Sequence, residues 1–376
     1  MKAEWRRKPF EDCIETVTYT QKIQRKNFLS EGEYPIVSQE EDFINGYWND
    51  EADLFKVSTP IVLFGDHTKA LKYVDFNFVL GADGVKILPP RDFLLPKFFF
   101  YQLQAANLDS LGYARHYKLL KELEIAYPSR PEQQRIVGLL DEAFEGIATA
   151  KANVGKNLHN ANELFESHLQ SVFNKRGKGW AEKRLDEVCT FSSGGTPSKS
   201  NSSYWSGEIP WVSGRDMKST RLSDSLLHIS RSAVDESSTR MAPAGTLLIL
   251  VRGMGLAHGA QIAELMVPCT FNQDIRGIHP EPDLISRYLL FALRDRINSS
   301  DNVLSSAAHG TLKIDSDELK SVMVPVLSRG HQQRIVATID SLSEETQRLE
   351  AICQQKLAAL DELKKSLLHQ AFTGAL

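Results

Sequence analysis

Residues 192–223 combine glycine and serine with basic and aromatic side chains, a composition that suits close contact with a phosphate backbone. We expect Trp205 and Trp211 to anchor the loop or the core rather than to stack on bases. Arg215 and Arg252 are stronger candidates for DNA contact than the lysines, because a planar guanidinium can donate two hydrogen bonds to guanine O6 and N7. The candidates in this half of the chain are Ser198, Lys199, Arg215, Lys218, Arg221, Arg252 and His309.

A second, weaker set of candidates lies in the first 130 residues. Basic side chains on loops are usually only solvated and scattered histidines are usually structural, so a plain surface or core role competes with DNA contact for each of them. The candidates are Lys22, Arg25, His67, Lys69, Arg115 and His116.

The chemistry of an enzyme has little support in the sequence. Asp315, Glu318 and Lys320 offer the acidic pair and lysine of a metal-dependent nuclease, but the stretch is more typical of a helix start with an acidic first turn. The sequence contains neither a GxxxxGK[ST] phosphate loop nor a pair of histidines four residues apart that could bind a metal. We therefore expect no catalytic residue, no metal and no cofactor in this chain.

Composition limits the possible environments. The four cysteines lie far apart, and no stretch approaches the run of about 20 apolar residues that spans a bilayer, so we expect a reducing cytoplasm and no membrane. The formal net charge of −4 argues mildly against a protein that neutralises phosphates alone. Any DNA-binding surface must be local, or shared with a partner.

The chain contains an internal duplication. The segment Gln133-Gln134-Arg135-Ile136-Val137 recurs as Gln332-Gln333-Arg334-Ile335-Val336, at an offset of 199 residues. The offset continues without a gap through pairs such as Asp141 and Asp340 to the end of the chain. Upstream the match is looser: Trp5–Cys13 resembles Trp180–Cys189, and Tyr127-Pro128 resembles Val324-Pro325. The chain is therefore two copies of a globule followed by a helix.

Both duplicated stretches have the apolar periodicity of a long helix. Steps of three and four predict a heptad seam on each helix. The first seam comprises Ile136, Leu140, Ala143, Ile147, Ala150, Val154, Ala161 and Leu164, and the second comprises Ile335, Ile339, Leu342, Leu349, Cys353, Leu360, Leu363 and Leu367. We expect the helices to pack antiparallel as a rigid spacer between the globules. The alternative is that each helix packs only on its own globule.

Some apolar residues are left over from these seams, and surplus apolar surface usually marks an interface. We therefore expect them to bind a partner protein. They are Leu158, Phe165, Leu169, Phe173, Ile352, Leu357 and Leu368.

The globules themselves contain short apolar runs such as 60–64 and 246–251, which predict strands, separated by turn residues. The fold class that follows is α+β, with two globules joined by two long antiparallel coiled-coil helices and an approximate twofold repeat. The boundaries are a first globule at 1–130, a first helix at 131–177, a second globule at 178–330 and a second helix at 331–376.

Several segments resemble the DNA specificity subunits of type I restriction-modification systems. In the second globule they are Gly194-Gly195-Thr196-Pro197-Ser198, Tyr204-Trp205, Ile209-Pro210-Trp211-Val212, Ala244-Gly245-Thr246, Arg252-Gly253, Phe271-Asn272-Gln273-Asp274 and His309-Gly310-Thr311. In the first globule they are Tyr34-Pro35-Ile36-Val37, Phe64-Gly65-Asp66-His67-Thr68, Gly81-Ala82-Asp83-Gly84-Val85-Lys86 and Gly112-Tyr113-Ala114-Arg115-His116-Tyr117. Together with the duplication, the resemblance extends over essentially the whole chain.

The resemblance implies two target-recognition domains, each contacting one half of an asymmetric two-part site in double-stranded DNA. It also implies that the helices set the gap and dock two methyltransferase subunits, which restriction and translocase subunits then join. S-adenosylmethionine, ATP and Mg²⁺ would be bound by those partners. Two alternatives stay open: a coiled-coil interaction scaffold, and a self-sufficient DNA-modifying enzyme.

Overall fold

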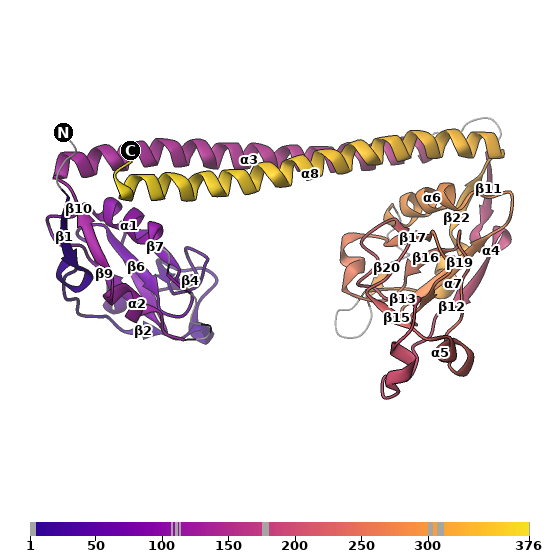
Figure 1. Cartoon of the computed structure of the whole chain (residues 1–376), viewed down its shortest axis with the longest axis horizontal. Coiled ribbons are helices and arrows are strands. Elements are labelled where there is room, and N and C mark those ends of the chain that lie inside the picture. The colour runs from indigo at the N-terminus through magenta and orange to yellow at the C-terminus, as the bar shows by residue number, and fades with distance from the viewer. Residues whose placement is uncertain are drawn as a thin grey trace. The chain divides into compact units, whose positions relative to one another are not determined.

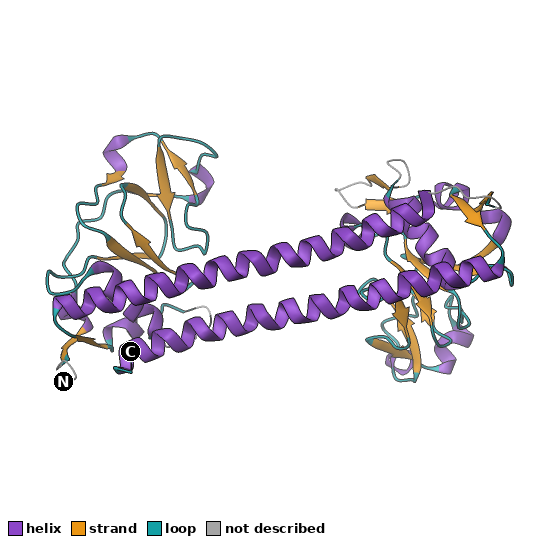
Figure 2. Ribbon diagram, turned by 90° about the horizontal axis from the view of Figure 1, so that it is seen from above, coloured by secondary structure: helices purple, strands orange, loops and turns teal. Residues whose placement is uncertain are grey.

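The structure, a computed structural model, describes residues 5–106, 108–109, 112, 114–174, 180–299, 304–306 and 312–375. It divides into two compact units: unit 1 comprises residues 1–157 and 352–376, and unit 2 comprises residues 158–351. Two helices of 45 residues, α3 (Arg130–Asn174) and α8 (Arg329–Thr373), each contribute to both units. Strands and shorter helices complete both units, which confirms the α+β fold class (Figure 2).

Unit 1 contains two main sheets and a strand pair. Its strands are β1 (Arg6–Pro9), β2 (Lys22–Ile23), β3 (Tyr34–Val37), β4 (Gly46–Trp48), β5 (Leu54–Phe55), β6 (Ile61–Gly65), β7 (Leu71–Val74), β8 (Phe78–Gly81), β9 (Val85–Leu88) and β10 (Glu124–Tyr127). Its short helices are α1 (Pro96–Ala105) and α2 (Tyr117–Lys121). One sheet has the order β2-β8-β3-β4 with β5 also on β8, the other is β7-β6-β9, and β1 pairs with β10.

Unit 2 also has one sheet of five strands and one of three, with an additional strand pair. Its strands are β11 (Ala181–Arg184), β12 (Cys189–Ser193), β13 (Ile209–Val212), β14 (Arg221–Leu222), β15 (Leu227–Ile229), β16 (Leu247–Leu250), β17 (Ile262–Leu265), β18 (Thr270–Phe271), β19 (Ile275–Pro280), β20 (Leu304–Ser306), β21 (Leu312–Ile314) and β22 (Met323–Val326). Its short helices are α4 (Leu185–Val188), α5 (Arg231–Glu236), α6 (Ser286–Asn298) and α7 (Ser316–Ser321). The sheets are β12-β19-β16-β17-β14 and β15-β13-β18, with the pairs β11-β22 and β20-β21. The expected strands at 60–64 and 246–251 are confirmed as β6 and β16.

The duplication is visible in the strand that begins each unit. The first strand pairs antiparallel with the strand that directly precedes a long helix, β1 with β10 and β11 with β22. Tyr127 lies opposite Arg6, and Val326 lies opposite Ala181. Tyr127-Pro128 therefore corresponds to Val326-Leu327, so the expected match with Val324-Pro325 is wrong by two residues.

Each unit packs against parts of both long helices. In unit 1, Lys151 of α3 forms an ion pair with Asp361 of α8, and the Lys364 ammonium lies 5.0 Å from the ring centre of Phe144. The last turns of α8 enter the core beneath α1, where Phe372 meets the ring of Phe98 at 5.2 Å. The two segments run antiparallel here, as expected. The alternative that each helix packs only on its own globule is wrong.

The buried positions of the long helices keep the heptad spacing along most of the expected seams. On α3, Leu140, Ile147 and Val154 are buried at intervals of seven residues. On α8, Ile339, Thr346 and Cys353 are buried at the same interval. Three expected seam residues are exposed instead: Leu164, Leu349 and Leu363, with exposed fractions of 64%, 49% and 46%.

Within each unit, one end of the globule lies against the long helices and the other end lies away from them. In unit 1, α1 and β10 are at the helix end, whereas β2 and α2 are at the far end (Figure 1). In unit 2, α6 and β22 are at the helix end, whereas β13, β15 and α5 are at the far end (Figure 1). No helix in the described part of the chain is long and apolar enough to cross a membrane.

Candidate nucleic-acid interface

A pocket of about 500 Å³ opens in unit 2 where β13, β16 and β18 end. Because β13 and β18 are parallel, the loops that follow them leave the sheet at the same edge and meet there. The pocket is lined by Thr196, Lys199, Trp211, Ser213, Gly214, Arg215, Leu226, Leu227, Leu250, Arg252, Gly253, Met254, Gly255, Asn272, Gln273 and Asp274.

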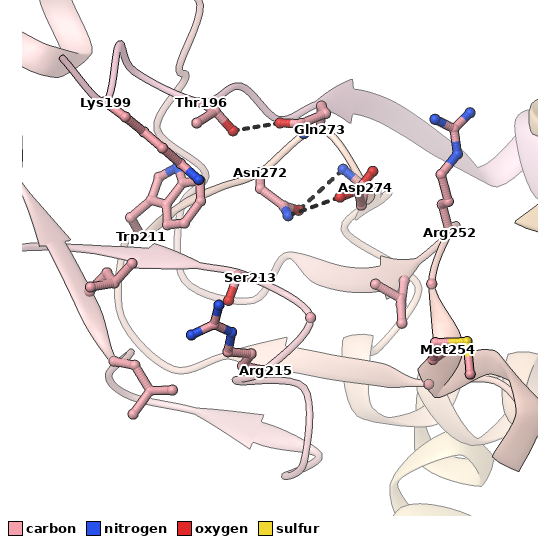
Figure 3. Close-up of a pocket in the computed structure, with 16 residues that line it drawn as sticks. Thr196, Lys199, Trp211, Ser213, Arg215, Arg252, Met254, Asn272, Gln273 and Asp274 are labelled. Atoms are coloured by element: carbon pink, nitrogen blue, oxygen red, sulfur yellow. Dashed lines mark hydrogen bonds between the residues drawn. The ribbon is translucent and has the colours of Figure 1, made fainter. Parts of the chain in front are cut away.

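Three of the expected DNA contacts, Lys199, Arg215 and Arg252, line this pocket from three separate loops (Figure 3). All three are exposed. Among the residues that the structure describes, no carboxylate, carbonyl or ring engages their charged groups. Three of the basic residues that the sequence singled out therefore lie together on one positively charged surface.

The glycine-rich loop is held to the sheet by its tryptophans. The Trp211 indole N–H donates to the Gly195 carbonyl at 2.9 Å, and the Trp205 indole N–H donates to the Ser198 carbonyl at 3.2 Å. Gly194 packs so closely that an added Cβ would lie 2.1 Å from the Asn272 carbonyl oxygen. This confirms the expectation that both tryptophans anchor the loop, and it explains why a glycine is needed.

The turn Asn272-Gln273-Asp274 forms the floor of the pocket. The Asn272 amide Nδ2 donates to Asp274 Oδ2 at 3.3 Å, the Asp274 backbone N–H donates to Asn272 Oδ1 at 3.1 Å, and the Thr196 hydroxyl donates to Gln273 Oε1 (Figure 3). These residues were not among the expected contacts. The segment Phe271–Asp274 was prominent in the sequence, but no local rule links a neutral amide to a pocket.

The carboxylate of Asp216 fixes two loops of the pocket to each other. Its Oδ2 accepts hydrogen bonds from the Ser213 backbone N–H and hydroxyl, both at 2.8 Å, and its Oδ1 accepts the Leu226 backbone N–H at 2.8 Å. The loop that carries Arg215 is thereby joined to the loop that carries Leu226. Charge-assisted hydrogen bonds of this kind hold a site in one geometry.

The remaining candidates of unit 2 do not line the pocket. Lys218 is exposed and follows the pocket residue Arg215 by three positions. The Ser198 hydroxyl forms a hydrogen bond with the Ser200 hydroxyl. Arg221 points to the helix end of the unit: its guanidinium donates to Asp340 of α8 at 2.9 Å, beside Arg287 on the same carboxylate, and its contact with DNA stays a prediction. His309 lies outside the described residues.

In unit 1 three candidates, one half-buried and two exposed, are at the far end of the globule or in the loop before α2. Lys22 of β2 lies over the Tyr19 ring at 4.9 Å, Arg25 pairs with Glu40 at 3.0 Å, and Arg115 is exposed. The Lys69 ammonium donates to the Leu108 carbonyl at 3.3 Å, in a hollow that residues of α8 also line, and its contact with DNA stays a prediction.

The two histidines of unit 1 differ. His116 is 1% exposed, with Nδ1 3.1 Å from the Asp66 carbonyl, so it cannot reach DNA, and that assignment is corrected. His67 is half-buried and lies two residues beyond the end of β6, as Arg252 lies two residues beyond the end of β16. Because β6 and β16 pair with β9 and β19 in the same register, His67 and Arg252 occupy equivalent positions.

The expected partner-binding residues are mostly core residues. Phe165, Leu169, Phe173 and Leu368 are 7%, 1%, 0% and 6% exposed, so they are not available to a partner and the expectation is corrected. They lie on the faces of the long helices that pack against the globules: Phe165, Leu169 and Phe173 belong to the core of unit 2, and Leu368 belongs to the core of unit 1. Leu158 and Leu357 are half-buried, and Ile352 remains exposed at 38%.

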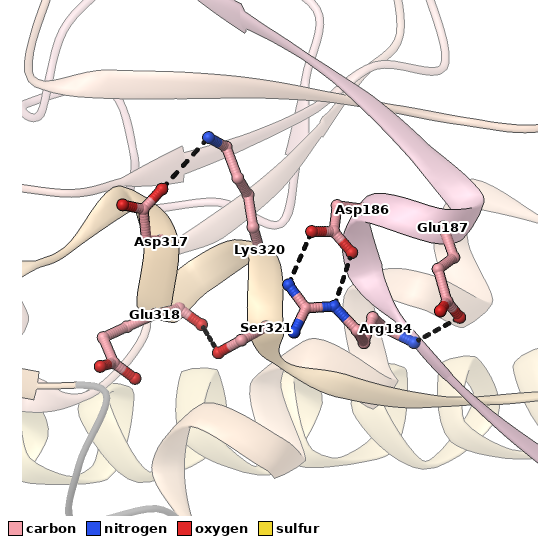
Figure 4. A network of polar contacts seen from close by, with 7 residues as sticks. All are labelled: Arg184, Asp186, Glu187, Asp317, Glu318, Lys320 and Ser321. Carbon is pink, nitrogen blue, oxygen red and sulfur yellow. Dashed lines mark hydrogen bonds and ion pairs between the residues drawn. The ribbon is translucent and has the colours of Figure 1, made fainter.

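The acidic cluster considered for a nuclease has a structural role. The Asp315 side chain caps α7 by accepting the Asp317 backbone N–H at 3.0 Å, and Lys320 pairs with Asp317 at 3.3 Å. Beside α7, Arg184 forms a paired contact with Asp186 (Figure 4). The expected helix start with an acidic first turn is confirmed. Among the described residues, no group of three or more His, Cys, Asp or Glu side chains is placed to hold a metal ion.

One buried acid of unit 2 lacks a partner. Asp295 of α6 is 2% exposed, and neither carboxylate oxygen has a hydrogen-bond partner. Burial raises the pKa of this carboxyl to about 6, against the lowering effect of Arg296 and with a further rise from Glu166.

Comparison with known proteins identifies close relatives. The profile of a family described as the type I restriction modification DNA specificity domain matches residues 177–358. The specificity subunit of the Escherichia coli type I restriction enzyme EcoR124I/EcoR124II is 30% identical over 335 residues, which is 85% of this chain and 81% of that protein. The MjaIX specificity subunit of Methanocaldococcus jannaschii is 28% identical over 184 residues, 47% of this chain and 42% of that protein.

Solved structures share the fold. A chain from a study of complex assembly and conformational transition in the type I R-M system has a TM-score of 0.72 at 19% identity, over 99% of both chains. The HsdS subunit from Thermoanaerobacter tengcongensis has a TM-score of 0.52 at 19% identity, over 99% of this chain and 97% of that one.

Proposed function

The chain belongs to the family of type I restriction-modification DNA specificity subunits, and on that premise we propose that it recognises a two-part, asymmetric DNA site through one globule per half. It has no catalytic residue and binds no cofactor of its own. Partner subunits supply S-adenosylmethionine, ATP and Mg²⁺ together with the chemistry that uses them. The alternatives of a scaffold or a self-sufficient enzyme are not favoured by the comparisons.

The observation that carries this proposal is the pocket of unit 2. Arginine side chains at the end of a sheet that form no ion pair with any carboxylate in the described part of the chain are placed to contact base edges and phosphates. In unit 1 the equivalent of Arg252 is His67. Because these side chains differ, the two half-sites need not be related by symmetry.

The proposed partners are two methyltransferase subunits, joined by restriction and translocase subunits, in the cytoplasm. The net charge of −4 supports a division of labour in which partners neutralise much of the DNA phosphate charge. The exposed side chains of Leu164, Leu349 and Ile352 on the long helices replace the buried ones as docking candidates.

The test is to map methylated sites genome-wide in cells that carry the chain and its methyltransferase. Arg215→Ala and Arg252→Ala should relax or abolish preference in one half-site and leave the other half intact. Arg231→Ala is the matched control, because Arg231 is an exposed arginine of unit 2 outside the pocket. Equal effects of all three substitutions would contradict the assignment of the pocket to DNA.

The absence of catalysis is tested separately. The purified chain should neither methylate nor cleave DNA and should not bind S-adenosylmethionine. Activity that survives removal of partner subunits would contradict the proposal.

A further inference from the structure

Three exposed apolar side chains share the pocket with the three free cations. Leu226, Leu227 and Met254 are 70%, 48% and 79% exposed, and all line the same hollow as Arg215 and Arg252. None of the three belongs to a hydrophobic core cluster of the described residues. A single exposed apolar residue is ordinary, but a group of them among cations points to a ligand that has both charge and an apolar group.

The backbone holds these side chains in place. Asp216 accepts the Leu226 N–H, and the Ser225 hydroxyl donates to the Leu227 carbonyl at 2.7 Å. Met254 is flanked by glycines: Gly253 has a φ of 140°, and a Cβ on Gly255 would lie 2.8 Å from the Gln261 side chain. The apolar group is therefore part of a defined surface and not a loose loop tip.

The chemistry of the DNA grooves identifies the ligand. In the major groove the apolar group on a base edge is the C5 methyl of a pyrimidine, present in thymine and in 5-methylcytosine. Guanine O6 and N7 are the acceptors that suit a guanidinium. A thymine beside a guanine would present a methyl to the apolar side chains and acceptors to the arginines.

We propose that this pocket recognises a 5-methylpyrimidine next to a guanine, with Leu226 and Met254 against the methyl group and Arg215 or Arg252 donating to the guanine. The inference rests on the proposed function, because it names the base edge that unit 2 recognises within its half-site. The thymine methyl is the expected source in unmodified DNA.

The test uses the assembled complex and duplexes that carry its mapped site. Each thymine of the half-site is replaced in turn by uracil, which removes only the methyl. At one or two positions binding should weaken about fourfold, the change that corresponds to one buried methyl. In a second set, single cytosines become 5-methylcytosine. Tighter binding of those duplexes, with no effect of uracil, would assign the methyl to 5-methylcytosine.

The protein variants separate methyl contact from other roles. The double substitution Leu226→Ala, Met254→Ala should weaken binding of the thymine duplex and remove its advantage over the uracil duplex. Met266→Ala, an exposed methionine of unit 2 outside the pocket, should keep both.

Three outcomes would overturn the inference. In the first, the wild-type complex binds with the same affinity whether thymine is replaced by uracil or cytosine by 5-methylcytosine, so it makes no methyl contact. In the second, the double variant still binds the thymine duplex more tightly than the uracil duplex, so other residues contact the methyl. Loss of methyltransferase copurification in the double variant, with no change in the thymine advantage, would assign the apolar group to a protein interface. The proposed function fails only if the wild-type complex shows no sequence preference at all.

Discussion

Gln133 and Gln332 make the same three hydrogen bonds in the two units. In unit 1, Gln133 accepts the Leu95 backbone N–H at 2.8 Å and donates to the carbonyls of Phe93 and Pro128. In unit 2, Gln332 accepts the Ile285 N–H at 2.8 Å and donates to the carbonyls of Asp283 and Leu327. Each amide joins the start of a long helix to the segment before α1 or α6, and both are fully buried.

Replacing either buried glutamine should destabilise its own unit. Gln133→Ala or Gln332→Ala leaves an N–H and two carbonyls without partners, at a cost of about 2–4 kcal/mol in the free energy of unfolding. Urea denaturation measures the change. Gln134→Ala and Gln333→Ala are the controls, because these neighbours are exposed. Equal losses of stability for the buried glutamines and their exposed neighbours would show that the hydrogen bonds of the buried side chains do not stabilise the units.

The positions of Leu169 and Leu164 on α3 give a second prediction. Leu169→Ala should lower the free energy of unfolding by about 2–5 kcal/mol, because Leu169 is buried in the core of unit 2. Leu164→Ala should change it by at most about 0.5 kcal/mol, since Leu164 is exposed. Thermal unfolding of the two variants measures the difference. The seam expected from the sequence, which includes Leu164 and not Leu169, predicts the larger loss for Leu164→Ala.

Asp295 makes stability depend on pH. The pKa of the Asp295 carboxyl is about 6 in the folded chain, above the ordinary value of 3.8. The protein is therefore most stable with respect to this group below about pH 4, and it loses that stability as the pH rises through 6 and the buried carboxyl ionises. Asp295→Asn should therefore raise the free energy of unfolding by ~3 kcal/mol at pH 8 and by little at pH 4. Denaturation at both pH values tests this, with the exposed Asp283→Asn as control. A gain that is the same at both would exclude ionisation as the cause.

Asp216 is predicted to be a positioning residue. Asp216→Ala removes the acceptor for Ser213 and for the Leu226 N–H, so the two loops of the pocket should separate. We expect weaker binding to the specific site and little change on random DNA, which competition binding measures. The control is Asp224→Ala, an exposed aspartate whose carboxylate contacts His228 and Ser225 only. A uniform loss on all DNA would instead indicate a general charge effect.

The heptad spacing of the buried positions predicts which insertions the long helices tolerate. Adding 21 residues after Asn157 and after Ala351, where the chain passes between units, inserts three heptads and keeps the buried positions in phase. At 1.5 Å per residue the helices lengthen by about 32 Å, close to one turn of DNA. The half-site sequences should survive while their gap grows by about nine base pairs, as methylation mapping would show.

Shorter insertions provide the contrast. Fourteen residues, two heptads, should keep the fold but lengthen the spacer by about 21 Å, roughly six-tenths of a DNA turn, which places the second half-site on the wrong face. A chain with 21 added residues that keeps the original gap would show that the helices do not set the spacing.

The framework of this fold was predictable because its constraints are periodic or repeated. The duplication was found through Gln133 and Gln332, and these side chains prove to be the joints between helix and globule. The heptad seam was predicted along most of its length, since Leu140, Ile147 and Val154 are buried as expected. The prediction was wrong at Leu164, because the apolar face of α3 turns there toward the core of unit 2. Arg215 and Arg252 were found from their chemistry alone. Asp216 and Asn272 were missed because their role depends on loops that meet only in three dimensions.

The two units also preserve a record of divergence. After one ancestral segment was copied, both copies kept the glutamine of the helix joint, and Asp141 and Asp340 still accept bonds from α1 and α6. At the sheet edge the two copies differ. His67 occupies the position that Arg252 has in the other copy, and the turn Gly81–Gly84 is one residue longer than the equivalent turn Asn272–Asp274. A lineage could thus acquire a new target by drift in a few loop residues while the inherited scaffold stayed intact.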